Sequence, residues 1–295
     1  MNTTALLVGL GPLLGWGLFP TIASKIGGKP ANQILGTTLG TFIFGLVYAL
    51  VGGYALPTGT VLLLSIISGI GWASAQIVTF MSFGLVGSSR AMPITTAFQL
   101  LGASLWGVIA LGNWPGIPAK IVGTIALAAI ILGAYMTVWS EKKTAQKASL
   151  LKKATIWLLF GEIGYWAYSA APQAAHIDGQ HAFLPQAIGM LLTGIVYGIY
   201  VAIKHKEENP FTEVVSYKQI FAGFFFAFAA LTYLISAQPN MNGLATGFVL
   251  SQTSVILATL TGIWFLGQKK TKKEMAVTIA GLIIILVAAA VTEFI

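Results

Sequence analysis

The side chains of this sequence that could do chemistry are few, and their types exclude most kinds of catalytic site. The 295 residues include no cysteine and three histidines, which rules out disulfides, thiolate metal ligands and cysteine nucleophiles. The sequence has no glycine-rich phosphate loop, no HExxH pair and no serine, histidine and acid arrangement. We therefore expect no enzyme, and we predict no catalytic residue, metal site or cofactor.

Glu162 is the only carboxylate that lies well inside an apolar segment, residues 154–174. An acid inside an apolar helix that crosses a membrane is expensive to keep there, and by default it marks a functional site. The functional hypothesis is a proton-coupling site that is neutral in one state and ionised in another. The structural alternatives are a neutral acid bonded to a backbone carbonyl and a residue that lies nearer the membrane interface, and the sequence favours neither these nor the functional hypothesis.

Aromatic rings and amides form a second set of polar groups inside apolar segments. A sugar ring has an apolar face and a rim of hydroxyls, so it suits an aromatic plate beside groups that both donate and accept hydrogen bonds. The predicted substrate-binding set is Trp16, Trp72, Tyr165 and Trp166 as plates, with Gln76, Gln99, Gln173, Gln252 and Asn32 as amides. The alternatives are anchoring at the membrane interface for the tryptophans and helix-to-helix hydrogen bonds for each amide.

The elements that must position these residues are membrane helices. Hydrophobic residues make up 56% of the chain and charged residues 8%, and the mean hydropathy is +0.84, whereas soluble domains carry roughly 25% charged residues. A crossing needs about 20 apolar residues. The spacing of charges and of glycine and proline turns predicts ten spans: residues 4–23, two within 30–89, one from 91 to the turn at 113–116, and then 121–140, 154–174, 182–203, two within 219–268, and 275–292.

The ten predicted spans fall into two sets of five that resemble each other. The segments TIA and IIL at 124–126 and 130–132 recur at 278–280 and 284–286, and GLVY at 45–48 resembles GIVY at 194–197. These matches favour an internal duplication, and because five is odd, the second copy must run in the opposite direction through the membrane. We predict a first repeat at 1–140, a basic cytoplasmic linker at 141–153 and a second repeat at 154–295.

The distribution of basic residues agrees with this inversion. Of the 16 lysines and arginines, 15 lie in the connections after the first, third, fifth, seventh and ninth spans, and Lys120 lies on the other side. The positive-inside rule places those connections in the cytoplasm and both termini outside. The net charge of +8 is spread over short tracts between apolar runs, so we expect no nucleic-acid partner.

Several segments together resemble one known family of membrane carriers. They are GWG at 15–17, KIGGKP at 25–30, GTT at 36–38, VGSSRAMPITT at 86–96, the segment 95–106 and the segments within 236–253. On these segments the chain resembles the glucose/ribose porter family of the drug/metabolite transporter superfamily. Its nearest members are the ribose uptake proteins of Gram-positive bacteria, and the likeness covers nearly the whole length.

This resemblance implies a carrier in a bacterial cytoplasmic membrane, built from ten helices as two inverted repeats. It implies import of a monosaccharide, with ribose favoured over glucose, driven by the proton gradient. We expect a midplane site and alternating access by rocking of one half against the other. The alternatives are an exporter of small amphipathic solutes, which requires a more apolar cavity, and a membrane-embedded sensor or accessory protein without transport.

Overall fold

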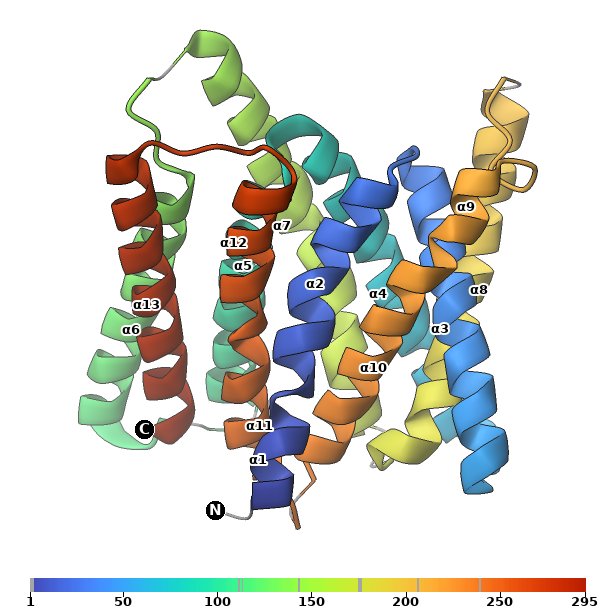
Figure 1. Ribbon diagram of the computed structural model, residues 1–295. Coiled ribbons are helices and arrows are strands. Elements are labelled where there is room, and N and C mark those ends of the chain that lie inside the picture. Colours follow the sequence, from blue (N-terminus) through green and yellow to red (C-terminus); the bar gives the residue numbers. More distant parts are fainter. Residues whose placement is uncertain are drawn as a thin grey trace.

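The computed structural model is all-helical in the residues that it describes, 3–110, 112, 114–142, 144–174, 177–205, 207–238 and 240–295, with the side chains of 110, 172–174 and 244–245 excepted. No strand occurs in these ranges. The helices run side by side in one bundle (Figure 1). They are α1 (Thr3–Gly9), α2 (Gly11–Ile26), α3 (Pro30–Gly52), α4 (Gly59–Val86), α5 (Ser88–Ala110), α6 (Gly116–Val138), α7 (Ala145–Ala174), α8 (Gly179–Lys204), α9 (Val214–Lys218), α10 (Ile220–Ser236), α11 (Gly243–Gln252), α12 (Ser254–Phe265) and α13 (Lys272–Phe294).

Nine segments of the described chain are long and apolar enough to cross a membrane. Six of them correspond to α3, α4, α5, α6, α8 and α13, and the other three are Thr3–Ile26, Val214–Ser236 and Thr246–Phe265, in each of which a short interruption separates two helices. The first interruption falls at Leu10, two residues before Pro12, which lacks the backbone N–H that would continue the hydrogen bonds of the preceding turn. The one predicted span that is not among these nine segments, residues 154–174, lies within α7.

Helix α7 begins earlier than the sequence predicted. It spans 30 residues, Ala145–Ala174, so residues 145–153 of the predicted linker are helical and extend α7 beyond the upper end of the bundle (Figure 1). The reason is local, because this stretch is rich in alanine, leucine and lysine, which are good helix formers, and has no glycine or proline. The irregular part of the linker is therefore short and lies between α6 and Ala145.

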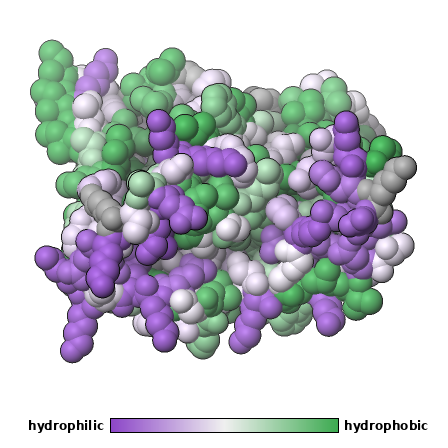
Figure 2. Space-filling view, turned by 90° about the horizontal axis from the view of Figure 1, so that it is seen from above, coloured by the Kyte–Doolittle hydropathy of each residue, from purple (hydrophilic) through white to green (hydrophobic). Residues whose placement is uncertain are grey.

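The upper face of the bundle in Figure 1 is the hydrophilic one. Figure 2 shows this face, where hydrophilic side chains gather around the ends of the helices. The exposed lysines of four connections, Lys25, Lys142, Lys204 and Lys269, belong to the set that the positive-inside rule assigns to the cytoplasm. Both chain ends lie at the opposite face (Figure 1).

Glycines let pairs of helices touch at their backbones. A Cβ built at any of four glycines would clash with a backbone carbonyl oxygen of the neighbouring helix, so no larger residue fits without movement. The distances from the added Cβ to the carbonyl oxygen are 1.9 Å for Gly69 to Gln186, 2.1 Å for Gly189 to Ile66, 2.3 Å for Gly40 to Ile220 and 2.3 Å for Gly223 to Thr37. These contacts join α4 to α8 and α3 to α10.

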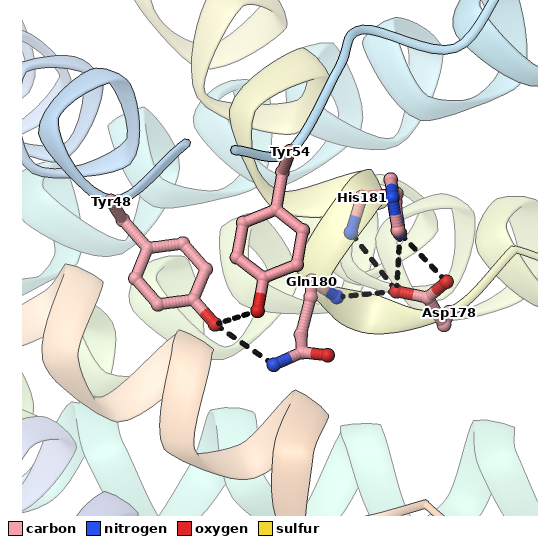
Figure 3. Close-up of polar contacts among 5 residues, drawn as sticks. All are labelled: Tyr48, Tyr54, Asp178, Gln180 and His181. Carbon is pink, nitrogen blue, oxygen red and sulfur yellow. Dashed lines mark hydrogen bonds and ion pairs between the residues drawn. The ribbon is translucent and has the colours of Figure 1, made fainter. Parts of the chain in front are cut away.

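The start of α8 is tied to the loop between α3 and α4 by a polar cluster (Figure 3). Asp178 caps α8, since its Oδ1 accepts hydrogen bonds from the backbone N–H groups of Gln180 and His181, both at 3.0 Å. The amide of Gln180 donates to the hydroxyl of Tyr48 (3.0 Å), whose ring stacks on Tyr54. Burial raises the pKa of the Asp178 carboxyl, but the backbone and side-chain contacts of His181 outweigh this and leave the pKa below its ordinary value.

Candidate functional site

A cavity of about 100 Å³ lies inside the bundle, between α2, α4, α5, α7, α10, α11 and the start of α12. It combines aromatic faces with short polar side chains. The aromatic residues are Trp16, Phe19, Trp72, Tyr165, Tyr168, Phe226, Tyr233 and Phe248, and the others are Gln76, Met92, Thr95, Thr96, Gln99, Ser169, Ser251, Gln252 and Ser254. None of these described lining residues carries a formal charge, so the cavity suits a neutral solute.

The cavity brings together six of the nine predicted substrate-binding residues. Trp16, Trp72, Gln76, Gln99, Tyr165 and Gln252 all line it, although they come from five different helices. The spacing of Thr95 and Gln99 is i, i+4, so both side chains lie on one face of α5. That spacing is a signal by which sequence reasoning could have found Thr95, which it missed along with the remaining lining residues.

Aromatic rings from the two halves of the chain meet at the wall of the cavity. The rings of Trp72 on α4 and Phe226 on α10 have centroids 3.9 Å apart with an interplanar angle of 31°. The Trp16 ring lies 6.3 Å from Phe226 and 5.6 Å from Tyr233 by the same measure. Phe226 was not predicted, but it follows Trp72 by 154 residues, the offset already seen between the two sequence halves.

Three hydrogen-bond donors at the cavity have no partner among the described residues. They are Nε1 of Trp16, Nε2 of Gln76 and the hydroxyl of Tyr168, all buried. A buried donor without a partner costs on the order of 1–3 kcal/mol, so each would be stabilised by an acceptor oxygen brought in by a solute. The other end of the Gln76 amide is occupied, because Oε1 accepts a hydrogen bond from the Tyr165 hydroxyl at 2.8 Å.

Glu162 lies on α7 one helical turn before Tyr165 and is 0% exposed. It is not among the lining residues, but Thr95, which is, donates a long hydrogen bond of 3.4 Å from Oγ1 to Oε2 of Glu162. The second oxygen, Oε1, has no hydrogen-bond partner among the described side chains and backbone groups. No ion pair to Glu162 occurs in the described part of the chain. Thr95 therefore links this carboxyl group to the cavity.

Three predicted residues do not join the cavity. Trp166 is 40% exposed, and its indole packs against Gly102 of α5; it follows Tyr165 directly, so it points about 100° further around the helix. Asn32 lies in the first turn of α3, where it accepts from the Lys29 backbone N–H (2.7 Å) and donates to Glu213 (2.9 Å). The side chain of Gln173 lies outside the described residues.

Comparisons with known proteins identify the family. A profile of the family described as "Sugar transport protein" matches residues 7–295. The chain is 70% identical over 295 residues to a protein of Enterococcus faecalis, covering 100% of both chains. It is 73% identical over 293 residues to a protein of Lactobacillus johnsonii (99% of both) and 64% identical over 295 residues to one of Staphylococcus aureus (100% of both). Each of these relatives bears the name "Putative ribose uptake protein RbsU".

A solved crystal structure shares the fold. It has a TM-score of 0.64 and 17% sequence identity, and the match covers 99% of this chain and 98% of that one. At this identity the likeness concerns the fold alone. The family and the names of the relatives indicate transport rather than catalysis, and they confirm the resemblance seen in the sequence. The chain belongs to the sugar transport protein family and is a multi-pass protein of the bacterial cytoplasmic membrane.

Proposed function

We propose that this protein is a secondary active transporter that imports a monosaccharide, with ribose favoured over glucose, by alternating access coupled to protons. The observation that carries the proposal is the uncharged cavity, in which aromatic faces lie beside unpartnered N–H and O–H donors. A sugar ring can lay its apolar face on such rings while its oxygens accept hydrogen bonds from the donors. Ribose takes precedence because the relatives compared above are named for ribose uptake.

The polarity of the lining distinguishes this proposal from an exporter of amphipathic solutes. Of the 17 lining residues in the described part of the chain, 11 carry an amide or a hydroxyl, and only Phe19, Met92, Phe226 and Phe248 are wholly apolar. An exporter of amphipathic solutes requires a more apolar cavity with few amides or hydroxyls. Each amide and hydroxyl can donate and accept, which matches the alternation of roles around the rim of a sugar.

Helix α7 is the tenth span in this proposal. Its length of 30 residues corresponds to about 45 Å at 1.5 Å per residue, which exceeds the hydrocarbon thickness of a bilayer. It is less apolar than the nine candidate spans because Glu162, Tyr165 and Tyr168 lie on it. Both chain ends lie at the same face of the bundle (Figure 1), and this arrangement needs an even number of crossings. Nine candidates and α7 make ten.

The glycine contacts support two inverted repeats. The two halves are offset by 149 residues at α3 and α8 (45 to 194) and by 154 residues at α6 and α13 (124 to 278). If the 149 offset holds for α3 and α8 and the 154 offset for α4 and α10, the contacts become equivalent in pairs. Gly69 with Gln186 then corresponds to Gly223 with Thr37, and Gly189 with Ile66 corresponds to Gly40 with Ile220. Packing that repeats residue for residue is expected of a duplicated, inverted unit.

Both repeats contribute to the cavity, which is what a rocking mechanism requires. Helices α2, α4 and α5 of the first repeat and α7, α10, α11 and α12 of the second all line it. A rotation of one group of helices against another would therefore change which side of the membrane the solute can reach, while the same residues remain in contact with it. The four glycine contacts cross between the repeats and join α4 to α8 and α3 to α10, so we expect each of these pairs to move together.

Glu162 is the proton-coupling residue in this proposal. A carboxyl group that is fully buried and has no cation beside it among the described residues differs greatly in energy between its neutral and charged forms. It can therefore exchange a proton only in a state that opens its surroundings to water. Thr95 contacts Glu162 and also lines the cavity, so a solute that hydrogen-bonds Thr95 would alter the environment of the carboxyl group.

Counterflow in proteoliposomes tests the transport proposal. Vesicles loaded with unlabelled D-ribose or D-glucose are diluted into labelled sugar, and a saturable carrier produces a transient uptake of label. We expect saturable exchange of ribose and weaker exchange of glucose. Exchange of neither sugar would overturn the monosaccharide claim. Exchange of both sugars with equal half-saturation would overturn the preference for ribose.

A further inference from the structure

A chain of hydrogen bonds connects α4 and α7 beside the cavity. The hydroxyl of Tyr165 donates to Oε1 of Gln76 (2.8 Å) and lies 3.0 Å from the hydroxyl of Thr79. Tyr165 and Gln76 line the cavity, whereas Thr79 is buried behind them and does not. The chain therefore runs from the interior of α4, across to α7, and back to the amide that faces the solute.

Counting hydrogens gives this chain a direction. Gln76 Oε1 can only accept, so it takes the one hydroxyl hydrogen of Tyr165. The Thr79 hydroxyl donates its own hydrogen to the Ala75 backbone oxygen (3.0 Å), and that hydrogen is the only one that the 3.0 Å contact between Thr79 and Tyr165 could share. The carbonyl end of the Gln76 amide is then held by Tyr165. The amide nitrogen is the opposite end of the same planar group, and it is buried with no hydrogen-bond partner among the residues that the structure describes. The orientation of Gln76 is thus set by a residue on another helix.

We propose that Tyr165 is a positioning residue that fixes the Gln76 amide with its N–H groups toward the solute, so that the site selects an oxygen able to accept at that point. This inference rests on the proposed function and deepens it. Without the Tyr165 hydroxyl the amide can turn by 180° and present its carbonyl instead, and the site no longer discriminates between a donor and an acceptor there. Trp16, whose Nε1 is also buried and unpartnered, can only donate, so the site faces the solute with two donors.

A double-mutant cycle tests whether Tyr165 acts through Gln76. The probe is labelled D-ribose, and the readout is its half-saturation concentration in counterflow for wild type, Tyr165→Phe, Gln76→Ala and the double variant. We expect Tyr165→Phe to raise that concentration about tenfold, Gln76→Ala to raise it at least as much, and the double variant to add nothing to Gln76→Ala. Effects that multiply in the double variant would overturn the proposal.

The matched control is the other buried tyrosine of the same helix. Tyr168 lines the cavity, and its hydroxyl has no hydrogen-bond partner in the described part of the chain. Tyr168→Phe should therefore combine with Gln76→Ala multiplicatively, since the two side chains act independently. A cycle for Tyr168 that shows the same non-additivity as Tyr165 would mean that loss of either tyrosine simply disturbs α7, and this would overturn the specific role of Tyr165.

Ribose analogues give a readout that a merely structural role would not change. In each analogue one hydroxyl is replaced either by hydrogen or by fluorine, which can accept weakly but cannot donate. For the hydroxyl that faces Gln76, the half-saturation concentration in wild type should be several-fold lower for the fluoro analogue than for the deoxy analogue. This gap should close in Tyr165→Phe, because the amide is then free to turn. An unchanged gap would overturn the proposal even if the affinity falls.

The proposal can also fail separately from the transport function. If wild type exchanges ribose but the cycle is additive, the role of Tyr165 is overturned and the transporter proposal stands. If wild type exchanges neither sugar, the transporter proposal falls, and the role of Tyr165 is decided by side-chain amide NMR of ¹⁵N-glutamine-labelled protein. The Gln76 signals, assigned with Gln76→Ala, should shift in Tyr165→Phe and stay in place in Tyr168→Phe; signals that stay in place in Tyr165→Phe would overturn it.

Discussion

In the proposed pair of repeats, helices α2 and α7 occupy equivalent places. Each sets a glycine against a backbone carbonyl of a neighbouring helix: a Cβ at Gly15 would lie 2.5 Å from the oxygen of Phe225, and one at Gly164 would lie 2.3 Å from that of Gly71. Each then places the next residue, an aromatic, at the cavity wall. With the 149-residue offset, Gly15 and Gly164 are equivalent positions.

The equivalent positions around these glycines differ in polarity. Leu13 on α2 corresponds to Glu162 on α7, and Phe19 corresponds to Tyr168. The Phe19 ring packs with Phe80, at a centroid distance of 5.9 Å, in an apolar cluster, whereas the hydroxyl of Tyr168 is buried with no partner among the described residues. One backbone arrangement thus serves apolar packing in the first half and polar chemistry in the second, and this difference accounts for the lower hydropathy of α7.

The largest expected effect is loss of coupling in Glu162→Gln. The substitution keeps the shape of the side chain but removes its titration, so uphill accumulation of ribose in vesicles with an imposed proton gradient should fall at least about tenfold, to the equilibrium level. Counterflow should persist. Glu207→Gln, at an exposed position in the loop between α8 and α9, is the control and should accumulate normally. Undiminished accumulation by Glu162→Gln would remove the functional contrast between α2 and α7.

Alanine at the two equivalent glycines tests whether α2 and α7 pack alike. Gly15→Ala and Gly164→Ala each place a methyl group against a backbone carbonyl, so we expect each to lower stability by about 1–3 kcal/mol. The measurement is the thermal unfolding temperature of the purified protein in detergent. Gly84→Ala is the matched control, since a Cβ there meets open space. A large effect at one glycine and none at the other would break the equivalence.

A reciprocal exchange of hydroxyls sharpens the contrast in polarity. Phe19→Tyr adds a hydroxyl among apolar rings, and we expect a loss of about 1–2 kcal/mol in stability. Tyr168→Phe removes a buried hydroxyl that has no hydrogen-bond partner in the described part of the protein, so it should leave the unfolding temperature unchanged or higher while weakening ribose counterflow a few-fold. Thermal unfolding and counterflow are measured on both variants. A stability loss in Tyr168→Phe with normal counterflow would contradict the assignment of polar chemistry to α7.

The smallest expected effect concerns the start of α8. Because the pKa of Asp178 is lowered in the folded protein, its cap on α8 is fully stabilising above the ordinary pKa of 3.8 and is lost as the pH falls through the lowered value. Asp178→Asn should therefore flatten the decline in stability below pH 4 by less than about 1 kcal/mol. An identical pH profile would contradict this cap.

Much of the arrangement could be predicted because it follows from solvent and charge. The length of apolar runs and the position of lysines indicated the helices and the face on which the lysines gather. The start of α7 was misplaced because lysines at 147, 152 and 153 were taken as the sign of a linker, although lysine is a good helix former and its charge reaches water from the end of a long helix. Charged residues therefore mark where a membrane-spanning segment ends, but a helix can continue through them into water.

The sequence by itself determined that this protein is embedded in a membrane. It also determined which few polar and aromatic side chains lie inside the membrane-spanning segments. Nine substrate-binding residues were predicted from that scarcity, and six of them line the cavity. Only the tertiary structure decided which face each residue presents: Tyr165 lines the cavity while its neighbour Trp166 packs against Gly102, and Asn32 bonds Glu213 from a distant segment. The physical reason is that hydropathy fixes depth in the membrane, whereas rotation about the helix axis depends on which neighbours pack closely.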